Sequence, residues 1–287
     1  MNNIYQQSSF SQLNQDGMTL VELMVALFIS LAVVGGILTF ASSSKSSYTM
    51  QNELGRLQEN ARFALDTLSR NIGSAGYRVT QPVPPNAGIL AFDPFTPAIP
   101  LPLENVDPHS DPLMGLTVAT GRASDRITIS KESVTGATTD CLGQNVLPAD
   151  VGTIITNTYS IEDLGPNGVP DGQFDLYCQG FRNGAAIGNA DILVEAVDNM
   201  QILYGEDRDN DDIADLYVNA NNVTNWQRIM SVRIALLMST VTPLRTGEME
   251  TETYALLNTR TMGPFAIGEN RIRRIFTRTI LVRTNLD

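Results

Sequence analysis

The strongest hydrophobic pattern in the chain is a nearly unbroken apolar run from Leu23 to Ala41. A polar segment, residues 1–17, precedes it, and a single acid, Glu22, stands directly before it. At the rise of an α-helix this run covers about 28 Å, close to the thickness of the hydrocarbon layer of a bilayer. The pattern therefore predicts a helix that can span a membrane, and no other segment of the chain is long and apolar enough to do so.

The helix is expected to continue past a polar patch at Ser42–Ser47, because apolar side chains then recur every three or four residues. They are Met50, Leu54, Leu57, Ala61, Leu65, Leu68 and Ile72. Gly73 and Gly76 can end the helix. We therefore predict one helix from about Thr19 to Ile72, apolar all round in its first half and amphipathic in its second. Gly35-Gly36, in the apolar half, favours either close helix packing or a point of bending.

The rest of the chain is typical of a β-rich domain. Nine of the fourteen prolines fall in residues 82–112, which predicts an extended loop. Beyond it, runs of branched and aromatic residues alternate with turn residues. The predicted strands are Arg126–Lys131, Thr153–Ile161, Phe174–Cys178, Met200–Tyr204, Leu216–Val218, Ile229–Met238 and Ile272–Val282. The expected fold class is α+β, with one long helix packed on a mainly antiparallel sheet.

The start of the apolar helix carries a recognisable motif. Residues 17–22 read Gly-Met-Thr-Leu-Val-Glu, and a charge inside a spanning segment costs about 2.5–3.5 kcal/mol at the membrane centre, which marks Glu22 as functional. The motif resembles the cleavage and methylation signal of type IV prepilins. The resemblance implies that a prepilin peptidase cuts after Gly17 and methylates Met18. It also implies that Glu22 pairs with the terminal amine of a neighbouring subunit during assembly.

Two features depart from that family, and two other interpretations stay open. Residues 1–17 contain no Lys or Arg, and Met18 stands where the family prefers Phe. An uncut signal anchor would also begin with an apolar helix. Ordinary secretion would instead use a cut near Ala41-Ser42-Ser43.

Two further blocks resemble PilW-type minor pilins. The first is Leu57–Leu65 followed by Ala75-Gly76-Tyr77, and the second runs from Leu193 to Leu237. The resemblance implies a pilin-like fold with a leader at 1–17, a membrane and assembly helix at 18–76, and a globular head at 77–287. The implied function is a minor pilin that helps to initiate or cap a type IV pilus, the machine of adhesion, twitching motility and DNA uptake. The alternatives are a minor pseudopilin of type II secretion and a calcium-dependent adhesin at a pilus tip.

The same resemblance implies partners and a location. The partners would be other minor and major pilins, the prepilin peptidase, the inner-membrane assembly platform and, through the helix, the membrane. The chain would cross the bacterial inner membrane once with its head in the periplasm, and later stand on the pilus at the cell surface. A DNA or host-surface ligand is left open, although a net charge of −12 argues against nucleic-acid binding by the bulk surface.

Cys141 and Cys178 are the only cysteines. An even count in a chain exposed outside the cytoplasm favours one disulfide over two separate buried thiols. No Cys or His spacing predicts a zinc site.

An acidic segment at residues 206–215 is the one stretch that predicts a ligand. Asp207, Asp209 and Asp211 alternate, Asp215 follows, and the carbonyl of Ile213 adds an oxygen. Such oxygens suit calcium, so no cofactor is required but Ca²⁺ is a candidate. The match to a calcium-binding helix–loop–helix is partial, because neither its glycine nor its final glutamate is present. The alternative is a solvated acidic turn, and we expect only a plain turn at Asp163–Asp175.

We do not expect an enzyme. The chain has no nucleophile elbow, phosphate loop or histidine-based triad, and its single histidine, His109, falls in the proline-rich loop. Five arginines near the end, Arg271, Arg273, Arg274, Arg278 and Arg283, favour a strand face paired with acids. Contact with another subunit or with DNA is the alternative for these arginines.

Overall fold

The computed structural model describes residues 18–76, 103–106, 124–133, 139–146, 153–164, 172–244, 252–257, 260–263, 265 and 271–282. The predicted leader with Gly17, most of the proline-rich loop with His109, and Arg283 lie outside the described residues. The chain divides into two compact units, Met1–Gln51 and Asn52–Asp287.

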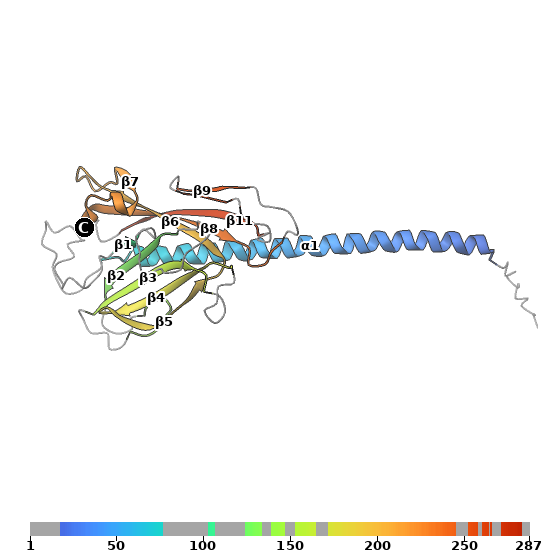
Figure 1. Ribbon diagram of the computed structural model, residues 1–287, viewed down its shortest axis with the longest axis horizontal. Helices are drawn as coiled ribbons and strands as arrows, with labels where there is room; N and C mark the ends of the chain where they lie inside the picture. Colours follow the sequence, from blue (N-terminus) through green and yellow to red (C-terminus); the bar gives the residue numbers. More distant parts are fainter. Residues whose placement is uncertain are drawn as a thin grey trace, which may run out of the picture. The chain divides into compact units, whose positions relative to one another are not determined.

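A single long helix, α1 (Leu20–Ile72), begins one residue later than predicted and ends where predicted (Figure 1). Its first half exposes its apolar side chains all round, whereas its second half buries one face. The buried side chains include Leu57, Ala61, Leu65, Leu68 and Ile72, as the three- and four-residue spacing requires. The chain leaves the helix through Gly76, which has a positive φ of 75°.

The first sheet of the head has five strands in the order β1-β2-β3-β4-β5, each antiparallel to its neighbours. The strands are β1 (Leu103–Val106), β2 (Arg126–Glu132), β3 (Ile154–Glu162), β4 (Asp175–Arg182) and β5 (Ala185–Val194). Two of them correct the sequence analysis. β1 lies inside the segment that we expected to be loop throughout, because four residues without proline pair there as an edge strand. β5 was not predicted, because six of its ten residues are Ala, Gly, Asn or Asp, which are uncommon in strands.

The second sheet has four strands in the order β11-β8-β6-β7, again antiparallel. Its strands are β6 (Val197–Glu206), β7 (Leu216–Val218), β8 (Ile229–Ser239) and β11 (Arg273–Leu281), and two short 3₁₀ turns, η2 (Ala220–Asn222) and η3 (Trp226–Arg228), precede β8. A separate hairpin of β9 (Tyr254–Leu256) and β10 (Arg260–Met262) adds two strands that were not predicted. Leu256 and Met262 of this hairpin pack with Ala235 and Leu237 of β8.

One hydrophobic core joins the second half of α1 to both sheets, with Leu68 from the helix, Ile129 from β2 and Ile234 from β8 all buried. The α+β class is therefore confirmed, with the described strands divided between two larger sheets and the β9–β10 hairpin. The division falls between β5 and β6, where buried Ala196 has a φ of 59°. Its N–H donates to Asp175 Oδ1 at 2.8 Å, which holds the bend between the two sheets.

Two long-range links reinforce the head. A disulfide joins Cys141 to Cys178 of β4 with a Cα–Cα distance of 6.3 Å, the pairing that the sequence analysis expects. A buried ion pair joins Arg273 Nε of β11 to Asp198 Oδ2 of β6 at 2.6 Å. The guanidinium of Arg273 also lies over the Phe265 ring, 3.5 Å from its centroid.

Candidate functional site

The start of α1 holds the acid of the N-terminal motif in a fixed place. The Thr19 N–H donates to Glu22 Oε2 at 3.4 Å, and the Glu22 N–H donates to Thr19 Oγ1 at 3.3 Å. This reciprocal pair is a capping box, which occupies two of the N–H groups that a helix start leaves free. Sequence reasoning missed the part played by Thr19, although Thr-x-x-Glu before an apolar run is its known signal. The result is a carboxylate held within one turn of Met18.

The rest of the first half of α1 forms a continuous apolar surface. The helix contains a window of mean hydropathy 2.5, long and apolar enough to cross a membrane. Phe28 and Leu31 are 77% and 70% exposed. The hydroxyls of Ser30 and Thr39 donate to backbone carbonyls of the same helix, so these polar groups are satisfied without water. An apolar surface of this extent requires lipid or other protein around it.

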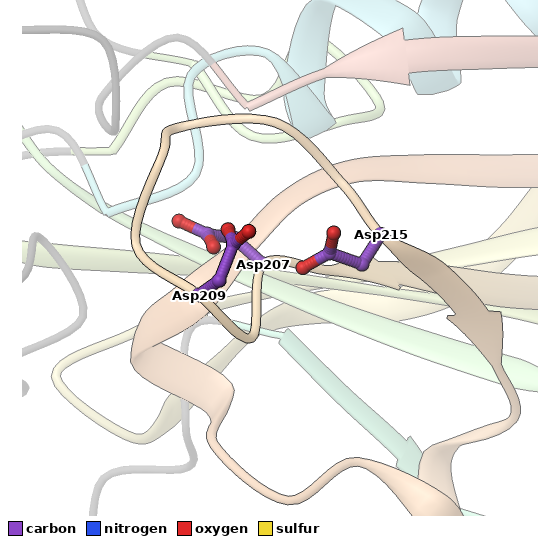
Figure 2. Close-up of side chains that lie close together, drawn as sticks. All are labelled: Asp207, Asp209 and Asp215. Atoms are coloured by element: carbon purple, nitrogen blue, oxygen red, sulfur yellow. The ribbon is translucent and has the colours of Figure 1, made fainter.

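The second candidate site is the loop between β6 and β7. Carboxylate oxygens of Asp207, Asp209 and Asp215 all lie within 4.8 Å of one another. Figure 2 shows the three side chains gathered inside the curve of the loop. The structure thus brings together three of the predicted ligands.

Asp207 is the buried member of this cluster and organises the loop. Its carboxylate accepts the Asn210 N–H at 2.6 Å and the Asp212 N–H at 3.2 Å. Asn210 and Asp212 both have positive φ values, 69° and 65°, and these turn the backbone back toward Asp207. Burial acts to raise the pKa of Asp207, but the backbone N–H bonds and the nearby Arg228 outweigh it and lower the pKa below its ordinary value.

The other two carboxylates of the cluster are exposed. Partial desolvation and repulsion from Asp211, Asp215 and Asp207 raise the pKa of Asp209. Asp215 Oδ2 accepts the Arg208 N–H at 2.8 Å. Negative charge is therefore concentrated at the exposed carboxylates of Asp209 and Asp215. Such a concentration of charge favours a bound cation.

Asp211 and Ile213 are placed differently from the other predicted ligands. Asp211 Oδ1 accepts the Ile213 N–H at 2.9 Å, and the Asp211 carboxylate lies outside the group of three. Buried Glu206, at the start of the loop, ties it to the segment before β8. Its Oε1 accepts hydrogen bonds from the N–H groups of Thr224 at 3.0 Å and Asn225 at 2.6 Å. Sequence reasoning did not single out Glu206, because its partners lie 18 and 19 residues further along the chain.

Two protein-family models match this chain, one at the N-terminal motif and one in the head. Residues 12–38 match the prokaryotic N-terminal methylation motif, and residues 158–284 match the type IV pilus-assembly protein W family. The chain is a PilW-like type IV pilin. The second match begins in β3 and contains the acidic loop and the second sheet.

The similarity of this PilW-like chain to solved structures is low. A type IV-like pilin from Thermus thermophilus matches at 15% identity with a TM-score of 0.41, covering 81% of this chain and 98% of that one. No curated protein matches the chain.

Three of the arginines near the end of this PilW-like chain have partners among the described residues. Arg273 pairs with Asp198, Arg278 with Asp66, and Arg271 donates to Gln173 Oε1 at 3.1 Å. Arg273 and Arg278 agree with the prediction of a strand face paired with acids, whereas Arg271 bonds a neutral side chain.

Proposed function

We propose that the chain is a minor pilin subunit that enters a type IV pilus through α1 after cleavage between Gly17 and Met18. The observation that carries the proposal is the placement of Glu22. It is the one acid in the apolar half of α1, and Thr19 holds it in the first turn of the helix. That placement accompanies family matches at both the methylation motif and the head.

The mechanism follows from the charge. Cleavage would make Met18 the first residue, so its amine would be a cation within one turn of Glu22. Inside a membrane or a filament core, an unpaired carboxylate is costly. Neighbouring helices would therefore align at the axial register in which Glu22 of one meets a cation of the other. The terminal amine of an adjacent subunit supplies that cation, while Thr19 keeps one carboxylate oxygen fixed.

Contacts of the head would determine the position of the subunit in the filament. As a minor pilin it would help to initiate or cap the filament, in contact with other minor and major pilins and with the inner-membrane assembly platform. Before assembly the chain would cross the bacterial inner membrane once with its head in the periplasm, and afterwards it would stand on the cell surface. A minor pseudopilin of type II secretion is the alternative, and the match to the pilus-assembly family favours the pilus. We assign no enzymatic activity.

The test is a Glu22→Gln variant, which keeps the shape of the side chain and removes its charge. We expect the peptidase to cut it normally and its incorporation into sheared filaments to fall at least about tenfold, since the register charge is lost. Glu53→Gln is the matched control. Glu53 belongs to the same helix but accepts hydrogen bonds from Thr242 in the head. Equal incorporation of the Glu22→Gln variant and the native chain would refute the assembly role.

As a second function we propose that the acidic loop binds Ca²⁺ and that the head then acts as a calcium-dependent adhesin. The convergence of Asp207, Asp209 and Asp215 supports the calcium site of this proposal, together with the raised pKa of Asp209. Desolvation and repulsion among the carboxylates raise this pKa, and calcium binding would relieve the repulsion.

The test is calcium titration of the full chain in detergent, followed by thermal unfolding. Ca²⁺ should raise the Tm of the native chain but not of Asp209→Ala, and Glu252→Ala, an exposed acid outside the loop, should behave as the native chain. An unchanged Tm in the native chain, or an equal rise in Asp209→Ala, would rule the calcium site out.

A further inference from the structure

Two of the four edge strands of the two larger described sheets, β5 and β11, carry opposite charges. Among the described strands, β5 pairs only with β4 and β11 pairs only with β8. Seven of the ten residues of β5 are exposed, and so are Thr277, Arg278 and Thr279 in the middle of β11. Figure 1 shows the two strands in different sheets of the head. An exposed edge offers unpaired backbone N–H and C=O groups, which another strand can pair with.

The edge at β5 ends beside a groove lined by apolar and acidic side chains. The groove has a volume of about 470 Å³ and is lined by Glu59, Asn60 and Phe63 of α1 and by residues 192–195. Phe63 is 50% exposed and Ile192 is 40% exposed. The acids here are Glu59, Glu195 and, on β5 itself, Asp191. Glu195 pairs with Arg56 at 2.6 Å, whereas Glu59 has no ion pair with a described residue.

The edge at β11 carries the opposite charge. Arg274 and Arg278 are both exposed, and β11 contains no acid. Arg278 pairs with Asp66 of α1, whereas Arg274 pairs with no described acid. Leu281, at the far end of the strand, is 59% exposed and adds an apolar side chain to the same edge. In a chain with a net charge of −12, a strand with three arginines and no acid is a local exception.

We propose that β11 of one copy of this chain adds, antiparallel, to β5 of a second copy. The strands match in length, with nine residues in β11 and ten in β5. An antiparallel arrangement brings the Arg274 end of β11 to the Val194 end of β5, where Glu59 and Glu195 lie. Backbone bonds along the edge supply affinity, and the complementary charges select the orientation.

The contact is head-to-tail, because it joins different surfaces of the two copies. Such an interface leaves a free β5 on one copy and a free β11 on the other, so further copies or a related head can continue the series. This inference rests on the proposed function, since α1 holds the copies in one membrane or filament where the two edges can meet.

The experiment uses two differently tagged full-length copies expressed in the same cells. One carries Glu59→Cys and the other Arg274→Cys, and a short bis-maleimide is added to intact membranes. The native cysteines are joined to each other, so the introduced thiols are the reactive ones. We expect a cross-linked dimer that carries both tags, at least about fivefold more abundant than the dimers from two Glu59→Cys copies or two Arg274→Cys copies.

A charge reversal then tests whether the complementary charges matter. Asp191→Lys in the Glu59→Cys copy should lower the mixed dimer at least about threefold, whereas Glu252→Lys, which changes net charge equally at another exposed acid, should not. Equal membrane levels of each variant, with the Cys141–Cys178 disulfide intact, show that the head has folded.

Three results would overturn the proposal: no mixed dimer, equal dimers from all three combinations, or cross-linking only to a different pilin. A chain that is cut at Met18 and still gives no mixed dimer would refute this contact and leave the proposed function standing. An uncut chain would refute the proposed function, whatever the cross-links.

Discussion

Replacing Asp198 by alanine is expected to leave the guanidinium of Arg273 buried without the carboxylate that it contacts at 2.6 Å. The side chain of Arg273 is only 1% exposed, so water cannot take the place of the lost partner. Breaking a buried ion pair by removing one partner costs about 3–5 kcal/mol. For a domain of this size each kcal/mol shifts Tm by about 2–4 °C, so we expect Tm to fall by roughly 6–20 °C.

The assay is thermal unfolding of the full chain in detergent, followed by circular dichroism. The control is Asp66→Ala, which breaks the other ion pair of β11, that of Arg278. Both side chains of that pair are more than two-fifths exposed, at 42% and 44%, so its loss should change Tm far less.

A double variant separates the burial penalty from the value of the pair itself. Asp198→Leu with Arg273→Met removes both charges, so it should recover most of the stability that Asp198→Ala loses. The reasoning fails if Asp198→Ala unfolds within about 1 kcal/mol of the native chain. It also fails if the double variant is less stable than the single one.

Three further predictions concern other parts of the chain. Cys178→Ser opens a loop with a sequence separation of 37 residues, so it should lower the free energy of unfolding by about 4 kcal/mol in a denaturant titration. Asp207→Asn should destabilise the head at neutral pH. Because the pKa of Asp207 is lower in the folded head than its ordinary value, its contribution is present above that ordinary value and is lost as the pH falls through the folded pKa, so the difference in unfolding midpoint should shrink in acid. Thr19→Ala should reduce incorporation into filaments less than Glu22→Gln does, and Thr19→Ser should restore it, since serine also forms a capping box.

Local patterns in the sequence were enough to predict the long helix. Its spacing of apolar residues repeats over many turns, and Gly73 and Gly76 mark its end. Strands rich in branched residues, such as Ile229–Met238, were predicted to within one residue of their ends. β5 was missed because its pairing with β4, through the Asn183-Gly184 turn, decides its structure more than its own residues do.

Long-range contacts explain what else could not be predicted. The division into two sheets depends on Ala196, held by a carboxylate 21 residues away, and the pair of Asp198 and Arg273 spans 75 residues. In the acidic loop, alternation of aspartates predicted a cluster. Which carboxylates converge depends on the positive φ values of Asn210 and Asp212, and these are not visible in the spacing.

The central claim is that the chain is a pilin whose mature form begins at Met18. The most direct test is mass spectrometry of the amino terminus of the membrane-extracted protein, from cells with and without prepilin peptidase. We predict a methylated Met18 start that disappears when the peptidase is absent. An intact Met1 start in both would indicate an uncut signal anchor, and a start near Ser42 would indicate ordinary secretion. Either result would contradict the role of Glu22 in assembly.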